Sequence, residues 1–261
     1  MRVLLAALAL AAPPPPAAPL PERPAAVADA LATTTTALQR AIDVWQTGPR
    51  ATGATPRDVT LWALHQQRLF LKLTYDAGLG RRARPLLAPE ARATLDARAR
   101  LVALTPPTRL PLSAFRTGAS LPARTLRRYY REAERRFGVQ WEVLAAVNFV
   151  ETGFNKLRSR SSAGAQGPMQ FMPATWRAYG LGGDVHDPRD AILGAANYLR
   201  ASGAARDLRR ALYAYNHSTR YVDAVVAFSG QMRRNGRIYF AYHSWQVFIK
   251  TPAGPRRITG P

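Results

Sequence analysis

The segment that most constrains the fold is an almost wholly apolar stretch from Trp141 to Val150 (WEVLAAVNFV). A helix built from it carries apolar side chains on nearly every face, and such a helix is stable only when other elements surround it. We therefore predict a central, buried helix around which a helical domain packs. The helix ends in Glu151, which places a carboxyl group at the edge of the core.

Glu151 has two possible roles. Burial disfavours the charged form of a carboxyl group, and the negative end of the helix dipole opposes the same charge, so both effects raise its pKa. A carboxyl group that keeps its proton near neutral pH can protonate a glycosidic oxygen. The alternative is an ordinary glutamate that reaches solvent at the last turn of its helix. Judged on this residue alone, the alternative is favoured.

Apolar residues at helical spacing predict further helices before the central one. Three or four are expected in an N-terminal helical region at residues 37–103, where Gly and Pro interrupt the pattern. A Pro-rich connector follows at residues 104–123. After it we expect an amphipathic, Arg-rich helix that ends at Gly138. None of these segments suggests chemistry of its own.

Helices are also expected after the central one. Pro173 and Pro188 each suit the first turn of a helix, the second of them after a capping Asp. Two more helices are predicted at residues 208–215 and 221–228. Residues 238–251 alternate aromatic and β-branched side chains before a Pro-Ala-Gly turn, which predicts a β-hairpin. The expected fold is therefore mainly α, with a small C-terminal β-hairpin.

The first twelve residues have the pattern of an export signal. Arg2 precedes an apolar run from Val3 to Ala12, as in a secretory signal peptide, and the alternative is a disordered Ala/Pro tail. Residues 13–36 are rich in Pro, Ala and Thr, which predicts a flexible segment. No later stretch approaches the roughly 20 apolar residues of a membrane span. We expect a secreted protein of the cell envelope, outside the cytoplasmic membrane, with no transmembrane segment in the mature chain.

The chain carries a formal net charge of +21, which is enough to suggest binding to nucleic-acid phosphates. Only three of its basic residues are lysines, however, and so strong a preference for arginine is equally typical of a biased genomic base composition. The anionic partner of an exported protein is the cell wall. We therefore expect attraction to anionic wall polymers and no binding of nucleic acid. The absence of cysteine excludes disulfides, thiolate metal sites and a cysteine nucleophile.

Four sequence blocks, taken in order, resemble the soluble lytic transglycosylase (SLT) domain family. They are VETGFN at 150–155, AGAQGPMQFMP at 163–173, ANYL at 196–199 and AYN at 214–216. Each block is weak alone, but the combination is specific. The resemblance implies a helical domain of goose-type-lysozyme-like fold that binds a glycan strand in a groove. The chain then divides into a signal peptide (1–12), a flexible segment (13–36), an N-terminal helical region (37–103), a connector (104–123), the catalytic domain (124–228) and a C-terminal β-hairpin extension (229–261).

The resemblance places the catalytic glutamate of the family at Glu151 and a tyrosine near its carboxyl group at Tyr215. It implies that Tyr215 binds the substrate together with five further residues: Thr152, Met169, Gln170, Asn197 and Asn216. Thr152 stands where the family usually has Ser, so a hydroxyl group is retained. Each position also has a structural alternative, because Met169 would suit the core, Tyr215 could simply pack, and Asn197 could bridge helices.

The type of reaction depends on a second carboxylate, because most glycosidases use two. Helix caps and charged helix faces explain most acidic residues of the domain, and only Asp184 is left uncommitted. A single glutamate suits the reaction that the resemblance implies, in which peptidoglycan is cleaved between MurNAc and GlcNAc and a 1,6-anhydro end forms. The alternatives are a muramidase of the same fold, with Asp184 positioning water, and a non-catalytic wall-binding protein. We expect no cofactor and no metal, since residues 181–187 are too few and too poor in acids for a calcium loop.

Overall fold

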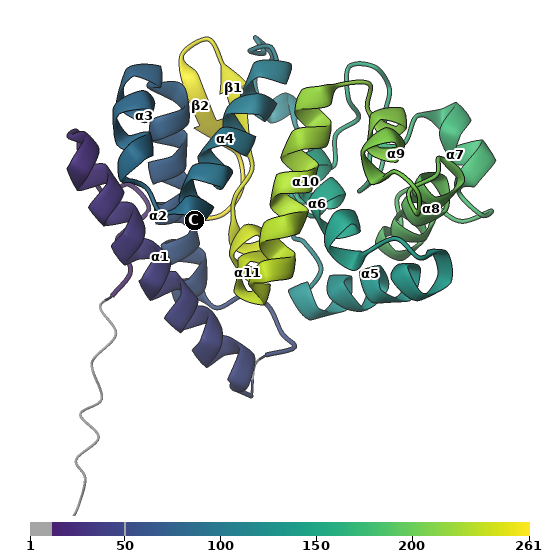
Figure 1. The fold of residues 1–261 in the computed structure, drawn as a ribbon, viewed down its shortest axis with the longest axis horizontal. Helices are drawn as coiled ribbons and strands as arrows, with labels where there is room; N and C mark the ends of the chain where they lie inside the picture. The colour runs from purple at the N-terminus through teal and green to yellow at the C-terminus, as the bar shows by residue number, and fades with distance from the viewer. Residues whose placement is uncertain (1–11, 50) are drawn as a thin grey trace, which may run out of the picture.

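The computed structural model describes residues 12–49 and 51–261, so that the predicted signal peptide lies, apart from Ala12, outside the described residues. The described part of the chain forms eleven α-helices and one two-stranded antiparallel sheet (Figure 1). The prediction of a mainly α fold with a small C-terminal hairpin is confirmed. None of the helices in the described ranges is long and apolar enough to cross a membrane.

The N-terminal region folds into four α-helices, as the spacing of its apolar residues predicts. The elements are α1 (Pro24–Thr47), α2 (Arg57–Tyr75), α3 (Ala77–Ala83), the 3-10 turn η1 (Arg84–Leu86) and α4 (Pro89–Leu104). Helix α1 nevertheless begins inside the segment predicted to be flexible. Val27, Leu31, Thr34 and Leu38 share one buried face of this helix, because they recur every three or four residues. The prediction of flexibility through residue 36 is therefore wrong from Pro24 onward, since the Ala- and Thr-rich composition masked this periodicity.

The second half of the chain surrounds the central helix. Its elements are η2 (Leu112–Ala114), α5 (Ala123–Phe137), α6 (Trp141–Thr152), α7 (Pro173–Tyr179), α8 (Pro188–Ala201), α9 (Leu208–Tyr215), α10 (Thr219–Arg234) and α11 (Gly236–Ser244). Side-chain oxygens of Asp187, Asp207, Ser218 and Asn235 accept backbone N–H groups at the starts of α8, α9, α10 and α11. Local capping thus fixes where four of these helices begin.

Helix α6 is the buried element that its sequence predicts. Its side chains are buried from Val143 to Asn148, and the helix contacts α5, α8, α10 and α11. Gly138 and Gly153 end α5 and α6 with φ of +72° and +58°, a left-handed conformation that glycine adopts without strain. The second of these glycines turns the chain two residues after Glu151.

The C-terminal hairpin is shorter than predicted. Strands β1 (Phe248–Thr251) and β2 (Gly254–Arg257) pair in antiparallel register, with Phe248 opposite Arg257. The residues from Ile238 to Ser244, which were expected to belong to the hairpin, form helix α11 instead. Tyr239, Phe240, Tyr242 and His243 are all buried there. Helix α11 packs against α1, α2, α6 and α10, so it buries side chains on several faces. The alternation of side chains in the sequence, which predicted a β-strand with one buried face, therefore did not identify this helix.

The two halves of the chain share one hydrophobic core. Helix α4 lies along α10, and α11 lies between α10 and the first two helices (Figure 1). A buried polar cluster joins three of these helices. The Thr94 hydroxyl (α4) donates to Gln231 Oε1 (α10) at 2.8 Å, and the Tyr242 hydroxyl (α11) donates to the same oxygen at 2.7 Å. The N-terminal helices are therefore part of the scaffold that positions α10.

Candidate active site

Glu151 lies in the last turn of α6, where its half-buried side chain faces α10. The hydroxyl group of Tyr221, in the first turn of α10, donates a hydrogen bond of 2.7 Å to Glu151 Oε1. The second carboxyl oxygen, Oε2, makes no hydrogen bond within the described ranges. The carboxyl group is thus held at one oxygen and leaves the other available to a bound molecule.

The environment of Glu151 changes its acidity in the direction that its sequence position predicts. Burial raises the pKa of Glu151 from 4.5 to about 7, against the smaller opposing effect of the Tyr221 hydrogen bond. Burial, and then the charge of Glu151, raise the pKa of Tyr221 well above 10, so this tyrosine keeps its proton and remains a donor. A carboxyl group with a pKa near 7 can both donate and accept a proton at neutral pH.

Tyr215, which the sequence placed near the catalytic carboxyl group, makes a different contact. Its hydroxyl group donates to the backbone carbonyl of Met169 at 2.6 Å. The charge of Glu151 contributes to the raised pKa of Tyr215, after burial, so the two side chains are close without being bonded. The tyrosine that holds the carboxyl group, Tyr221, was missed by sequence reasoning, because nothing in its position distinguished it from a core aromatic residue.

Thr152 is buried, with 2% of its surface exposed, and its hydroxyl group is fully engaged. It donates to the carbonyl of Pro168 at 2.7 Å and accepts the backbone N–H of Asn155 at 2.9 Å. Thr152 therefore joins the loop after α6 to the loop before α7. The Thr152 hydroxyl group therefore positions these two loops and does not face solvent.

Met169 and Gln170 form the tip of a tight loop. The side chain of Met169 is fully buried, as its structural alternative predicted. Gln170 has φ of +49°, and its side-chain Nε2 donates to the carbonyl of Gly167 at 3.0 Å. Gln166 and Phe171 pair as an isolated bridge on either side of the tip. Of Met169 and Gln170, only Gln170 has a side chain that is partly exposed.

The two asparagines predicted to bind substrate differ in their exposure to solvent. Asn197 lies on α8, and its Nδ2 donates to the carbonyl of Tyr179 at the end of α7 at 3.1 Å, so it bridges two helices. Asn216 follows α9 and is exposed. Within the predicted set, Asn216 is therefore exposed and Gln170 and Asn197 are partly exposed, whereas Thr152 and Met169 are buried behind them.

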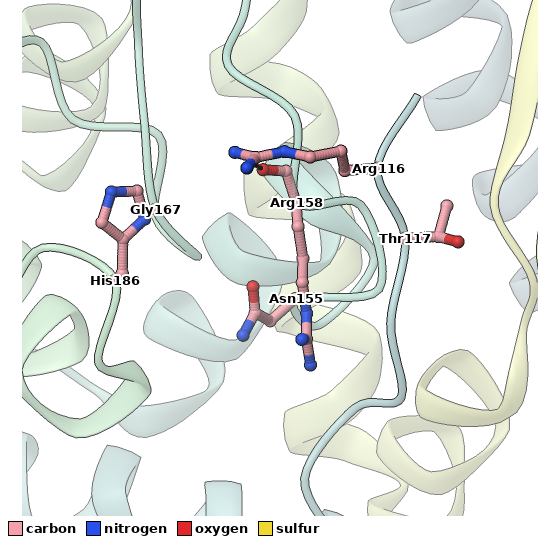
Figure 2. A pocket seen from close by; sticks show the side chains of 6 residues that line it. All are labelled: Arg116, Thr117, Asn155, Arg158, Gly167 and His186. Atoms are coloured by element: carbon pink, nitrogen blue, oxygen red, sulfur yellow. Dashed lines mark hydrogen bonds between the residues drawn. The ribbon is translucent and has the colours of Figure 1, made fainter. Parts of the chain in front are cut away.

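A cavity of about 360 Å³ lies beside these loops (Figure 2). It is lined by Arg116, Thr117, Asn155, Arg158, Gly167 and His186. Asn155 and Gly167 belong to the two loops that Thr152 joins. Arg116 and Thr117 come from the connector before α5, to which the sequence assigned no role.

Comparison with known proteins identifies the domain that carries Glu151. Residues 128–235 match the family model described as the transglycosylase SLT domain. The membrane-bound lytic murein transglycosylase F of Thiobacillus denitrificans is 35% identical over 74 residues, which cover 28% of this chain and 15% of that protein. This chain thus matches only a small part of that relative's length. No solved structure matches the chain closely enough for comparison. The SLT domain predicted from four sequence blocks is confirmed over residues 128–235.

Proposed function

We propose that this chain, whose residues 128–235 form a transglycosylase SLT domain, is a lytic transglycosylase that cleaves peptidoglycan glycan strands. The observation that carries the proposal is Glu151, a carboxyl group with a pKa of about 7 that Tyr221 holds at one oxygen. The family and the printed name of the relative support the substrate class.

In the proposed reaction, Glu151 acts first as an acid and then as a base. Its protonated carboxyl group gives its proton to the oxygen that links C1 of MurNAc to O4 of GlcNAc, and the C1–O4 bond breaks. The resulting carboxylate then takes the proton of the MurNAc 6-hydroxyl group while O6 bonds to C1. The products are a free GlcNAc 4-hydroxyl group and a 1,6-anhydroMurNAc end. Glu151 regains its proton, so one group completes the cycle without water.

The surroundings of Glu151 favour this scheme over hydrolysis. Burial and the Tyr221 hydrogen bond account for its shifted pKa, without a contribution from another carboxylate of the described chain. Asp184, the partner that a hydrolase would need, is exposed and accepts the backbone N–H of His186 at 2.8 Å. A glycosidase that activates water commonly does so with a second carboxylate. An internal hydroxyl nucleophile removes that requirement.

Binding of the strand falls to the exposed residues near Glu151. Gln170 and Asn216 offer amide groups to sugar hydroxyls, and Tyr215, Thr152, Met169 and Asn197 hold the surrounding loops and helices. We further propose that the protein works in the cell envelope after export. There its net charge of +21 attracts anionic wall polymers. Helix α5 contributes an arginine-rich outer face to this attraction.

Digestion of purified peptidoglycan tests the function, with the products analysed by mass spectrometry. We expect the wild-type protein to release fragments with 1,6-anhydro ends and Glu151→Gln to release none. Glu142→Gln is the matched control, because it removes a carboxyl group from the first turn of the same helix. Fragments heavier by one water, with reducing ends, would identify a muramidase instead. Absence of release by the wild type would favour a wall-binding protein.

A further inference from the structure

The cavity beside the loops that follow Glu151 is cationic. Two of its six lining residues are arginines, one is a histidine, and none is acidic. In Figure 2 the Arg116 guanidinium group extends from the connector toward the side of the cavity that carries His186. Neither Arg116 nor Arg158 forms an ion pair with an acidic residue in the described ranges. The cavity thus presents positive charge without a protein counter-charge.

The wall that carries the two arginines is held together by backbone pairing. Thr117 and Leu157 form an antiparallel bridge, and the carbonyl of Arg116 accepts the backbone N–H of Arg158 at 2.8 Å. The backbone N–H of Arg116 donates to Ser159 Oγ at 2.7 Å. The connector is therefore fixed along the loop after Glu151. Arg116 lies outside the matched SLT segment, so the connector adds a charged residue that the segment itself lacks.

The arginine side chains occupy different positions in this wall. Arg158 Nη2 donates to the carbonyl of Ala119 at 2.9 Å, and its guanidinium lies against Gly118, where an added Cβ would approach Arg158 Cζ to 2.3 Å. Arg116 makes only a long contact of 3.4 Å, from Nη2 to the carbonyl of Arg158. Arg158 is thus committed to the protein, and Arg116 keeps most of its donors for a ligand.

The cavity is mechanically connected to Glu151 through its neighbour Thr152. The Thr152 hydroxyl group binds the backbone of Asn155 on one side and that of Pro168 on the other. Asn155 lines the cavity, and so does Gly167, which precedes Pro168. A Cβ at Gly167 would lie 2.0 Å from the carbonyl of Val185, so this glycine allows the chain next to His186 to pack closely. Both walls are therefore tied to Thr152, the residue that follows Glu151.

We propose that this cavity binds a carboxylate of the peptide stem attached to the muramic acid that Glu151 acts on. The inference rests on the proposed function. In a stem-bearing strand the lactyl carboxyl group of each muramic acid is amide-linked to the stem, so the free carboxylates lie on the stem. A guanidinium group binds a carboxylate through two parallel hydrogen bonds. Arg116 is the binding group, and Asn155 and His186 complete the polar lining. The connector thereby makes the enzyme selective for strands that still bear peptides.

Two substrates of matched strand length test this selectivity. One is strands with their stems; the other is strands from which an amidase has removed the stems and whose newly freed lactyl carboxylates have been capped as methylamides. Both are freed of wall polymers. We expect Arg116→Gln to raise KM about tenfold on stem-bearing strands, the loss of one charge-assisted contact, and to leave KM on bare strands unchanged. Arg116→Lys keeps the charge without the paired donors and should fall between. The control is Arg160→Gln, which removes an exposed arginine from the same loop outside the cavity lining.

Equal effects of Arg116→Gln on the two substrates, or no effect on either, would overturn the carboxylate site. Thermal unfolding of each variant separates a folding defect from a binding defect. Binding of the strands to Glu151→Gln with and without Arg116→Gln gives a second measurement that needs no turnover. If the wild type cleaves neither substrate, the proposed function fails, and a preference for stem-bearing strands in the binding measurement would still support the cavity.

Discussion

Replacing Glu151 with Gln should stabilise the protein at neutral and alkaline pH while it removes activity. Gln keeps the shape of the side chain and still offers an oxygen to the Tyr221 hydroxyl group, so the main change is the loss of a titrating group. In the folded protein the pKa of Glu151 is about 7, and in the unfolded chain it returns to about 4.5. Folding above pH 4.5 must therefore keep a proton on a group that would otherwise lose it.

The sign and size of the effect follow from proton linkage. Between pH 4.5 and about 7 the unfolded chain binds fewer protons than the folded protein, so the contribution of Glu151 to stability falls as pH rises. At about 1.4 kcal/mol per pH unit, the total loss is about 3 kcal/mol, and partial access of solvent to the carboxyl group makes this an upper value. Glu151→Gln has no titrating carboxyl group at this position, so its free energy of unfolding should not fall in this way.

Denaturant unfolding of both proteins between about pH 4 and pH 8.5 measures the difference directly. Near pH 4 the two free energies of unfolding should differ little. By about pH 8 the Gln variant should be more stable by about 2 to 3 kcal/mol. Glu142→Gln, which removes a carboxyl group from the first turn of the same helix, serves as the control. A difference that stays constant over the whole pH range would refute the argument that Glu151 is protonated at neutral pH.

Three further predictions concern neighbours of the site. Tyr221→Phe removes the hydrogen bond that lowers the pKa of Glu151, so the alkaline limb of the pH–rate profile should move above its wild-type position; a limb at lower pH would contradict this. Thr152→Val leaves the Pro168 carbonyl unpaired and should cost about 1–3 kcal/mol in denaturant unfolding, whereas Thr152→Ser should keep most of that stability. Burial lowers the pKa of Lys156 to about 7, and its Nζ donates to the carbonyls of His243 and Trp245. Lys156→Met should therefore destabilise the protein more at pH 9 than at pH 7, because between its folded and unfolded pKa values the folded state holds fewer protons.

The features that sequence reasoning found are those that local patterns encode. The run from Trp141 to Val150 has too few polar residues for a surface helix, which identified α6 and the position of Glu151 at the edge of the core. Gly138 and Pro188 marked helix ends through their own backbone preferences. The four blocks predicted the SLT domain because their combination, rather than any one of them, is specific; the substrate-binding roles of Gln170 and Asn216 stay predictions.

The features that it missed depend on contacts between distant parts of the chain. Tyr221 reaches Glu151 across 70 positions, and Arg116 reaches the loop after Glu151 across more than 40. The residues of α11 form a helix because they are enclosed by four other helices, and a short aromatic run does not reveal this enclosure. Thr152 was predicted to bind substrate, and its buried partners in the backbone of Asn155 and Pro168 could not be read from its neighbours in sequence.

The packing of α4 along α10 also determines how much of the chain the matched SLT segment needs in order to fold. The matched segment ends one residue after α10, yet the face of α10 that carries Gln231 is covered by Thr94 and Tyr242, which lie outside that segment. The stretch of sequence shared with the family is therefore smaller than the cooperative folding unit. A chain cut at residues 128–235 would expose apolar surface and leave the helix that carries Tyr221 unsupported. In this protein, the boundaries of the matched SLT segment and those of the packed structure do not coincide.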